Sequence, residues 1–582
     1  MENKALLNEV LEKAQTWLDG NYDLETKKAV RQMMDADDKT ELVESFYRDL
    51  EFGTGGLRGI MGVGTNRMNI YTVGAATQGL SNYLKAQFAN LPQISVVIGH
   101  DCRNNSRKFA EISADIFSAN GIKVYLFEEL RPTPEVSFAI RHFGCQSGII
   151  LTASHNPKEY NGYKAYWDDG AQMIAPHDEN VISEVMKIKD VNEIKFKGNP
   201  DLIEIIGEDV DKLFIDNIKT ISLSPESIKR NKDMKIVFTP IHGTAVKLVP
   251  RALKEYGFTN IIHVPEQDVV SGDFPTVYSP NPEEPAALDM AIKKAIETDA
   301  DLVLATDPDS DRMGIAVKND KNHWMLVNGN QTALIFVYYL IRRWKELGKL
   351  KGKEFIVKTI VTTEIIKEIA EKNHVECFDC YTGFKWIAAI IRENEATKQY
   401  IGGGEESYGF LPETFVRDKD AVSSCTLMAE ISAWAKDNGK TLYELLQDIY
   451  LEYGYGKEKG ISVVRKGKSG AEEIQKIMSD FRNNPPKELA GSNIVVIKDY
   501  KTLKQTNLAT GEVTDLDMPV TSNVLQYFTE DGTKISVRPS GTEPKIKFYI
   551  EVRGEMKSRA DYDAADTAAN QKIEAARASL GV

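Results

Sequence analysis

The chain is organised around residues 147–157, which read Ser147-Gly-Ile-Ile-Leu-Thr-Ala-Ser-His-Asn-Pro157. The first residues form an apolar run of the length of a buried parallel strand. Pro157 stops the backbone and restricts Asn156, so the strand should run directly into a tight loop. Ser154 would then lie at the carboxyl end of a strand, where open α/β sheets keep their ligands. A polar loop with a capping serine would have the same pattern.

The neighbours of Ser154 do not form a familiar serine-nucleophile arrangement. His155 is adjacent to it, and adjacent side chains rarely place a base against a nucleophile. A nucleophile elbow would need glycine at two positions that hold Thr152 and Asn156. The meaning of this loop therefore depends on the loops that follow it.

On both sides of this loop, short apolar runs alternate with segments of helical periodicity. This alternation is typical of βαβ units with parallel or mixed sheets, and it restarts twice along the chain. The predicted strands are at residues 95–99, 123–127, 147–150, 235–238, 260–264, 301–305, 355–360 and 400–401. The predicted helices are at residues 106–119, 134–143, 244–256, 285–298, 331–346 and 363–372.

The two ends of the chain follow other patterns. Residues 1–50 have apolar positions at helical spacing, and the last part combines alternating strands with a closing helix at 558–579. We therefore predict an α/β fold: three related α/β modules with mixed sheets plus a smaller C-terminal α+β domain. The N-terminal helices belong to the first of four predicted domains, which are residues 1–205, 206–322, 323–440 and 441–582.

The composition excludes several classes of protein. The 582 residues are 42% hydrophobic and 27% charged, without a run of 18 apolar residues or a signal-peptide layout at the N-terminus. A net charge of −14 argues against nucleic acid or an anionic membrane as the main partner. Five cysteines, including one lone CxxC pair at Cys377 and Cys380, suit reduced thiols. We expect a cytoplasmic protein.

The loop Asp307-Pro-Asp-Ser-Asp-Arg312 follows directly on the strand predicted at 301–305. Three carboxylates at every second position would repel one another unless a cation or a proton intervenes. Ligands that are all oxygen favour Mg²⁺ or a similar hard ion. A calcium EF-hand loop is excluded because Arg312 and Lys318 stand where that loop needs Gly and Glu. A solvated acidic turn is the alternative.

Three further loops carry groups that suit an anion or sugar hydroxyls. Phe52-Gly-Thr-Gly-Gly-Leu-Arg-Gly59 is a glycine-dense loop in which Arg58 can meet an anion. Ile401-Gly-Gly-Gly-Glu-Glu-Ser-Tyr-Gly409 offers Glu405 and Ser407 to sugar hydroxyls. Val537-Arg-Pro-Ser-Gly-Thr-Glu-Pro544 combines a guanidinium with two hydroxyls, which fits a phosphate cradle. Each of the last two loops taken alone also fits an ordinary turn.

Together these loops resemble a known family. Thr152–Pro157, Asp307–Arg312, Gly404–Gly409 and Arg538–Thr542 are similar to the four signature loops of the α-D-phosphohexomutases, in the same order and one per domain. The resemblance spans roughly residues 50–550. The segments 55–59 and 381–386 are most similar to the phosphoglucomutase-2 branch of that family.

The resemblance implies four domains around a central cleft and a phosphorylated serine at Ser154. It also implies that Mg²⁺ is held by a phosphoserine oxygen together with Asp307, Asp309 and Asp311. Such an enzyme hands its phosphoryl group to a small phosphosugar. It then takes back the other phosphoryl group from the bisphosphorylated sugar. Glucose 1,6-bisphosphate would be this intermediate and an activator.

The resemblance also assigns roles to other side chains. Arg58 and Arg312 would clamp the transferring phosphoryl group. Lys164, ten residues after Ser154, would be a general acid/base whose proton is loosened by neighbouring cations. His155 would either hydrogen-bond the loop or transfer a proton. The remaining groups would bind the sugar or its non-reacting phosphate: Lys385, Glu405, Ser407, Arg538, Ser540, Gly541 and Thr542.

The predicted function is a phosphosugar mutase that interconverts glucose 1-phosphate and glucose 6-phosphate. A phosphopentomutase, a phosphomannomutase or a sugar 1,6-bisphosphate synthase on the same scaffold is the alternative. A non-catalytic phosphosugar-binding protein is a further one. The segment 407–409 lacks the histidine that mannose-tolerant relatives often carry there, which favours glucose. We expect a monomer or weak dimer.

Overall fold

The computed structural model of the chain describes residues 2–51, 53, 55–465, 467–540 and 545–582. The first three helices form a small apolar unit in which Trp17 stacks on Tyr22 with ring centroids 4.4 Å apart. The side chain of Asp23 caps the second helix by accepting a hydrogen bond from the Thr26 amide. The helices are α1 (Glu2–Asp19), α2 (Leu24–Asp35) and α3 (Thr40–Phe46).

The first α/β module has a six-stranded mixed sheet in the order β1-β5-β4-β2-β3-β6. The strand predicted around the Ser154 loop is confirmed, since β4 is wholly buried and pairs in parallel with β2. The strands are β1 (Gly56–Ile60), β2 (Ser95–His100), β3 (Lys123–Phe127), β4 (Ser147–Leu151), β5 (Tyr160–Trp167) and β6 (Ile203–Ile206). The helices are α4 (Ile70–Gln87), α5 (Ser106–Ala119), α6 (Thr133–Phe143) and α7 (His177–Lys187).

One expectation in this module was wrong. We predicted a glycine-dense loop over residues 52–59, but β1 begins at Gly56 and pairs antiparallel with β5. A side chain at Gly56 would be impossible, because its Cβ would lie 1.8 Å from the carbonyl oxygen of Tyr163. These glycines therefore bring two strands together, and Arg58 lies on a strand opposite Gly162.

The second module has a five-stranded sheet in the order β11-β10-β9-β7-β8, in which β7 pairs in parallel with β8 and β9. The strands are β7 (Lys235–Thr239), β8 (Asn260–His263), β9 (Leu302–Thr306), β10 (Met313–Lys318) and β11 (Trp324–Val327). The helices are α8 (Glu208–Lys219), α9 (Pro225–Arg230), α10 (Ala245–Tyr256), α11 (Pro265–Asp268) and α12 (Pro285–Thr298).

The third module has a four-stranded sheet in the order β13-β12-β14-β15. Its strands are β12 (Glu354–Thr359), β13 (Glu376–Cys380), β14 (Gln399–Gly404) and β15 (Phe410–Leu411). Its helices are α13 (Gly329–Glu346), α14 (Ile365–Lys372), α15 (Phe384–Asn394), α16 (Ala421–Asp437) and α17 (Leu442–Tyr453). Helix α16 is almost entirely buried because it also packs on α9 and α10 of the second module.

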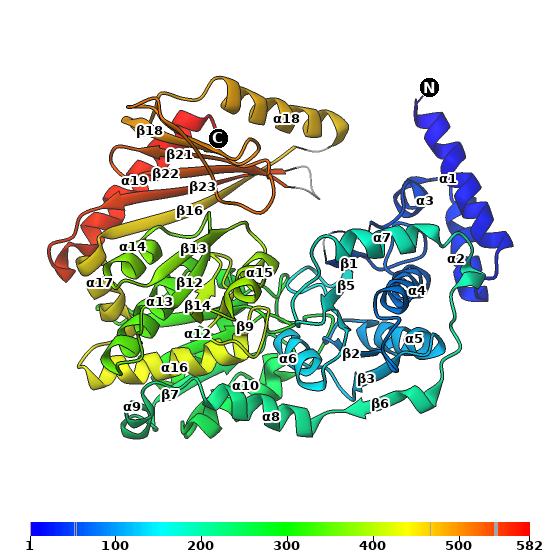
Figure 1. Ribbon diagram of the computed structural model, residues 1–582, viewed down its shortest axis with the longest axis horizontal. Helices are drawn as coiled ribbons and strands as arrows, with labels where there is room; N and C mark the ends of the chain where they lie inside the picture. The colour runs from blue at the N-terminus through cyan, green and yellow to red at the C-terminus, as the bar shows by residue number, and fades with distance from the viewer. Residues whose placement is uncertain (1, 52, 54, 466, 541–544) are drawn as a thin grey trace.

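The fourth domain is an antiparallel sheet covered by two helices, as expected for an α+β domain. Figure 1 shows this domain over the third module, with the first module on the other side of the molecule. Its strands are β16 (Tyr455–Val464), β17 (Glu488–Leu489), β18 (Ser492–Asp499), β19 (Lys504–Asn507), β20 (Val513–Asp515), β21 (Leu525–Thr529), β22 (Lys534–Pro539) and β23 (Lys545–Gly554). Its helices are α18 (Gly467–Asn483) and α19 (Tyr562–Leu580).

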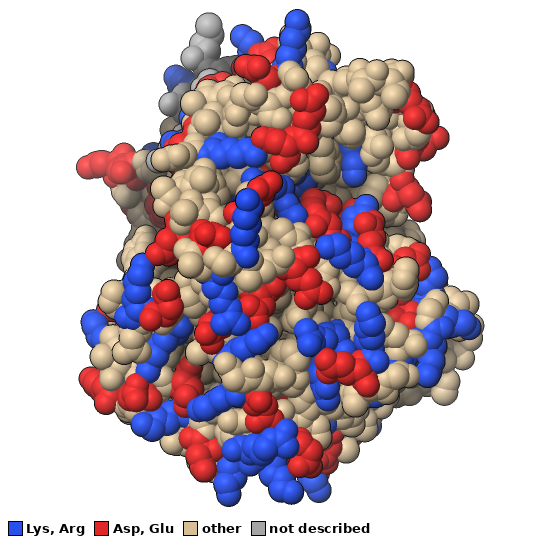
Figure 2. Space-filling view, turned by 90° about the vertical axis from the view of Figure 1, so that its left-hand side faces the viewer, with Lys and Arg blue, Asp and Glu red and all other residues tan. Residues whose placement is uncertain are grey.

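Two of the predicted domain divisions fall close to packed elements. The division at residue 205 lies inside β6, which pairs with β3 of the first sheet. The division at residue 440 precedes α17, which packs on α13, α14 and α16. The exact divisions stay predictions. None of the described helices is long and apolar enough to cross a membrane. On the face shown in Figure 2, acidic and basic side chains are interspersed.

Candidate functional site

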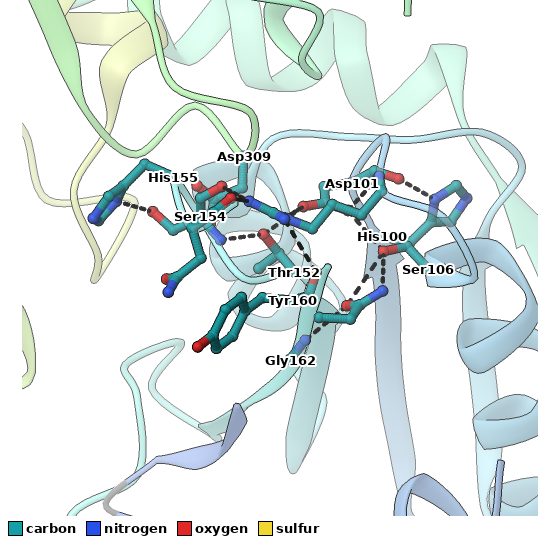
Figure 3. A network of polar contacts seen from close by, with 12 residues as sticks. His100, Asp101, Ser106, Thr152, Ser154, His155, Tyr160, Gly162 and Asp309 are labelled. Carbon is teal, nitrogen blue, oxygen red and sulfur yellow. Dashed lines mark hydrogen bonds and ion pairs between the residues drawn. The ribbon is translucent and has the colours of Figure 1, made fainter. Parts of the chain in front are cut away.

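Ser154 lies at the carboxyl end of β4, as predicted, and is 3% exposed. Its backbone has φ 51°, in the left-handed region that serine rarely adopts. Its hydroxyl donates a hydrogen bond of 2.7 Å to Asp307 Oδ2 and lies 3.1 Å from His155 Nδ1. Figure 3 shows Ser154 with His155, Thr152 and Asp309 around it. The serine loop of the first module therefore meets the aspartate loop of the second.

The three aspartates Asp307, Asp309 and Asp311 are buried together directly after β9. One oxygen from each lies within 4.8 Å of the others. Within the described part of the chain, Oδ1 of Asp309 and Oδ1 of Asp311 are buried without a hydrogen-bond partner. Buried carboxylate oxygens that are crowded and unpaired are what a hard cation would neutralise. The aspartates thus fit the metal site that the sequence predicted.

Two lysines from other modules face the aspartates. Lys164 Nζ on β5 lies 2.6 Å from Asp309 Oδ2 and 2.9 Å from Asp311 Oδ2. Lys419 Nζ, from the segment before α16, lies 3.2 Å from Asp311 Oδ2. The three modules therefore each contribute charged groups to one buried cluster.

The pKa values in this cluster follow from burial and the neighbouring charges. Burial, together with Asp309 and Asp311, raises the pKa of Asp307 well above its usual value. Burial alone would lower the pKa of Lys164, but Asp309 and Asp311 outweigh it and raise that pKa. We expected neighbouring cations to loosen the Lys164 proton, and this reason was wrong: its nearest charged partners are carboxylates.

The two predicted clamp arginines lie around the serine loop. Arg58 is exposed and its Nη1 donates to Asn156 Oδ1 over 3.1 Å. Arg312 follows the aspartates, and its Nη1 lies 2.6 Å from Glu283 Oε1. Burial and then these two arginines lower the pKa of His155 well below its usual value. His155 is therefore neutral near pH 7 and suited to hydrogen bonding.

The predicted sugar and phosphate groups lie further along the cleft. Lys385 and Arg538 line one cavity of about 200 Å³ between the third and fourth domains. Glu405 is buried and accepts a 2.8 Å hydrogen bond from the Gly383 amide, which ties its loop to the start of α15. Ser407 lines a separate cavity of about 330 Å³ beside β23.

The phosphate loop is described in part. Arg538 lies on β22 opposite Lys547, and the Ser540 amide donates to the carbonyl of Lys545. The predictions for Gly541 and Thr542 lie outside the described residues. The side chains of Arg538 and Lys534 share one face of β22, since they are four residues apart on a strand.

Sequence reasoning missed three residues that organise this site. Lys419 belongs to Arg417-Asp-Lys-Asp420, a charged run directly before the apolar helix α16, and that contrast was a usable signal. Thr133 donates 2.9 Å to Asp309 Oδ2 from the start of α6. Arg103 donates 2.7 Å to the carbonyl oxygen of Ser154. Nothing in the local sequence of the last two indicates such long-range contacts.

Comparison with known proteins places this arrangement in a family. The family descriptions phosphoglucomutase/phosphomannomutase, alpha/beta/alpha domains I, II and III and C-terminal domain match residues 49–192, 212–321, 328–453 and 461–566. The chain belongs to the phosphoglucomutase/phosphomannomutase family. This confirms the predicted α-D-phosphohexomutase membership and fold class.

Individual relatives agree with this assignment. The chain is 36% identical over 524 residues to a phosphoglucomutase of Staphylococcus haemolyticus, which covers 90% of this chain and 94% of the relative. It is 38% identical over 514 residues to a phosphoglucomutase of Staphylococcus aureus strain MRSA252, with 88% and 91% covered. These relatives indicate that the chain is a mutase, which is an isomerase.

Solved structures show the same fold at low sequence identity. Parafusin, a phosphoglucomutase from Paramecium in its open form, has a TM-score of 0.67 at 18% identity and covers 92% of this chain and 96% of its own. A phosphoglucomutase/phosphomannomutase family protein from Burkholderia thailandensis has a TM-score of 0.66 at 19% identity, with 91% and 97% covered.

Proposed function

We propose that this protein interconverts glucose 1-phosphate and glucose 6-phosphate through a phosphoserine at Ser154 and glucose 1,6-bisphosphate. The observation that carries the proposal is the buried contact between the Ser154 hydroxyl and Asp307. This contact brings a hydroxyl that can accept a phosphoryl group next to the buried aspartates that would hold a divalent cation. The phosphoglucomutase relatives support glucose as the sugar.

Mg²⁺ would be held by Asp307, Asp309 and Asp311 together with an oxygen of the phosphorylated serine. When bound, it neutralises charge on the transferring phosphoryl group. The donor set supports this choice, because all candidate ligands are oxygens and two of them are buried without a hydrogen-bond partner among the described residues. Arg58 and Arg312 would stabilise the remaining negative charge.

Lys164 would move the proton of the reacting sugar hydroxyl. The raised pKa that Asp309 and Asp311 cause keeps it protonated, so it starts as an acid or an electrostatic partner. Lys419, which shares Asp311 with it, would act as a second cation at the same point. His155, held neutral, would hydrogen-bond the serine loop.

The non-reacting phosphate of the substrate would bind between the third and fourth domains. Arg538 and Lys385 supply two cations to one cavity there. Ser540 would add a hydroxyl, with Gly541 and Thr542 beside it. Glu405 and Ser407 would contact sugar hydroxyls. We propose that the fourth domain closes on this phosphate, which would exclude water from the phosphoserine.

Intact mass and a substrate panel test the function directly. The purified protein should carry a fraction that is heavier by one phosphoryl group, and peptide mapping should place it on Ser154. Glucose 1-phosphate should be turned over faster than mannose, glucosamine or ribose 1-phosphate, with added glucose 1,6-bisphosphate. In Ser154→Ala both the phosphoprotein and the turnover should vanish. An alanine variant within about tenfold of the parent would overturn the assignment.

A further inference from the structure

Arg103 is a buried arginine that hydrogen-bonds the backbone of the Ser154 loop and does not contact the serine hydroxyl. Arg103 lies between β2 and α5 and is 3% exposed. Its Nη2 donates to the carbonyl oxygens of Ser154, at 2.7 Å, and of Asn156. Its Nη1 donates to the carbonyl oxygens of Pro157, at 2.9 Å, and Tyr160, at 3.1 Å. The guanidinium of Arg103 therefore donates hydrogen bonds to four backbone carbonyls around the serine loop.

Arg103 is itself fixed by a buried carboxylate. Asp101 Oδ2 lies 3.3 Å from Arg103 Nε and accepts 2.7 Å from the hydroxyl of Thr152. Asp101 Oδ1 accepts 2.7 Å from the hydroxyl of Ser106. Figure 3 shows Asp101, Thr152 and Ser106 joined in this way. Each of the two terminal nitrogens of the guanidinium donates to two carbonyl oxygens, so rotation of this planar group would break four hydrogen bonds at once.

The network closes on the backbone of the nucleophile. The Ser154 amide donates 2.9 Å to Thr152 Oγ1, while its carbonyl accepts from Arg103. Both backbone polar groups of Ser154 are therefore hydrogen-bonded within this network. That arrangement stabilises the left-handed φ of 51°, which costs a non-glycine residue about 1 kcal/mol. It also aims the Ser154 hydroxyl at Asp307.

The second module covers this arginine. The ring of Phe274 lies over the guanidinium, with its centroid 5.0 Å from Arg103 Cζ, and is itself 2% exposed. Next to it, a Cβ at Gly272 would lie only 2.4 Å from the Asn104 amide nitrogen. The side chain of Asn104 also donates 3.1 Å to Asp273 Oδ1. The backbone around Arg103 is therefore in close contact with the module that carries the aspartates.

We propose that Arg103 is a positioning residue that sets the reactive conformation of Ser154 and fixes its loop to the second module through Phe274. This inference rests on the proposed function. Arg103 spends its donors on backbone carbonyls and not on the serine hydroxyl, so it acts through the loop. A displacement of about 1 Å at a reacting atom can cost about a hundredfold in rate.

Arg103→Lys is the main test, because lysine keeps the charge but cannot reach four carbonyls. We expect kcat to fall about a hundredfold, while KM for glucose 1-phosphate changes by less than about threefold. KM should hold because the non-reacting phosphate binds in the fourth domain. The rate at which glucose 1,6-bisphosphate phosphorylates Ser154, followed by intact mass, should fall by a similar factor. Unchanged kcat or unchanged labelling would overturn the proposal, as would a loss that lies only in KM.

Arg67→Lys is the matched control. Arg67 is 5% exposed and donates to the carbonyl oxygens of Glu44, at 2.8 Å, and Asn66, at 3.3 Å, away from the aspartates. It should lose a comparable amount of thermal stability and keep its kcat within about twofold. If it loses as much kcat as Arg103→Lys, the role of Arg103 is structural only and the proposal fails.

Phe274→Leu keeps the inference testable if Arg103→Lys does not fold. Loss of the ring over the guanidinium should lower kcat about fivefold with KM unchanged, and a parent-like kcat would overturn the link to the second module. The labelling assay also separates this proposal from the function itself. A parent that is labelled on Ser154 but does not interconvert the two glucose phosphates overturns the function alone. The labelling rates of parent and variant still decide the role of Arg103.

Discussion

Two buried charge clusters connect the modules, and they are built differently. The triad cluster consists of Asp307, Asp309, Asp311, Lys164 and Lys419. It holds three carboxylates against two ammonium groups, and two of its carboxylate oxygens lack hydrogen-bond partners within the described residues. The interface cluster consists of Lys358, Glu364, Lys534 and Glu551 and joins the third domain to the fourth. Lys358 Nζ also lies 2.7 Å from Asp379 Oδ1, and within the described residues no buried oxygen of Glu364 or Glu551 lacks a hydrogen-bond partner.

The two glutamates of the interface cluster accept several hydrogen bonds. Glu364 Oε1 lies 3.1 Å from Lys358 Nζ and 2.7 Å from Lys534 Nζ. Glu551 Oε1 accepts from the Thr363 hydroxyl and the Glu364 amide, and its Oε2 lies 3.1 Å from Lys534. A buried cluster whose central carboxylates are hydrogen-bonded stabilises the interface, whereas one whose carboxylate oxygens lack hydrogen-bond partners is suited to a cation. Substitutions in the triad cluster should therefore lower activity more than stability, and substitutions in the interface cluster should lower stability more than activity.

The largest effect is expected from Asp309→Asn in the triad cluster. The change removes one negative charge from the proposed metal site with almost no change in shape, so kcat/KM should fall about a thousandfold or more. Thermal stability in metal-free buffer should be nearly unchanged, because repulsion among the aspartates is relieved. A coupled glucose 6-phosphate assay and a melting curve measure the two quantities. Asp299→Asn, which removes an exposed carboxylate, is the control. A melting temperature that drops as severely as activity would make the triad structural.

Glu551→Gln should reverse that signature. It leaves Lys534 short of a buried partner, and breaking such a pair costs about 3 kcal/mol in the free energy of unfolding. The folded enzyme should keep kcat within about tenfold, since no reacting group is touched. Urea titration and steady-state kinetics on the same preparation separate the two effects. Preserved stability combined with lost turnover would mean that this cluster, too, belongs to the catalytic machinery.

Arg538→Ala tests the proposed phosphate-binding residue on the same strand as Lys534 of the interface cluster. Arg538 lies on β22, four residues after Lys534 of the interface cluster. Loss of one charge-assisted contact to the non-reacting phosphate should cost about 2–3 kcal/mol in kcat/KM. The loss should appear for both glucose 1-phosphate and glucose 6-phosphate, because the intermediate presents each phosphate there in turn. Initial rates in both directions measure it. Impairment of one direction alone would exclude a shared site for the two phosphates.

The smallest expected effect is the pH dependence of stability near the interface cluster. Burial and the neighbouring Glu551 raise the pKa of Glu458 from 4.5 to about 7. The folded state then binds a proton that the unfolded state has released, so stability should fall as pH rises from 4.5 through about 7. Melting curves from about pH 5 to about pH 8 test this slope, and Glu458→Gln should flatten it. An unchanged slope in the variant would assign the pH dependence to another group.

The sequence by itself determined most of the local structure. Apolar runs bounded by turn residues predicted β4, β9 and the strands that precede the other loops, because a buried strand consists of consecutive apolar residues. The loop residues also indicated their chemistry. Three buried aspartates at alternate positions imply a cation or a proton between them, and within the described part of the chain Asp309 and Asp311 each have a buried oxygen without a hydrogen-bond partner.

Only the tertiary structure decided which groups meet. Lys164 reaches the aspartates because β5 returns antiparallel beside β4, which places it opposite Ile150. Lys419 arrives from the third module because α16 packs on the second. Arg103 donates a hydrogen bond to Ser154, which lies far from it in the sequence, and no local pattern predicts this contact. Contacts between loops of different modules depend on how whole sheets and helices pack, and that packing sums many weak interactions spread along the chain.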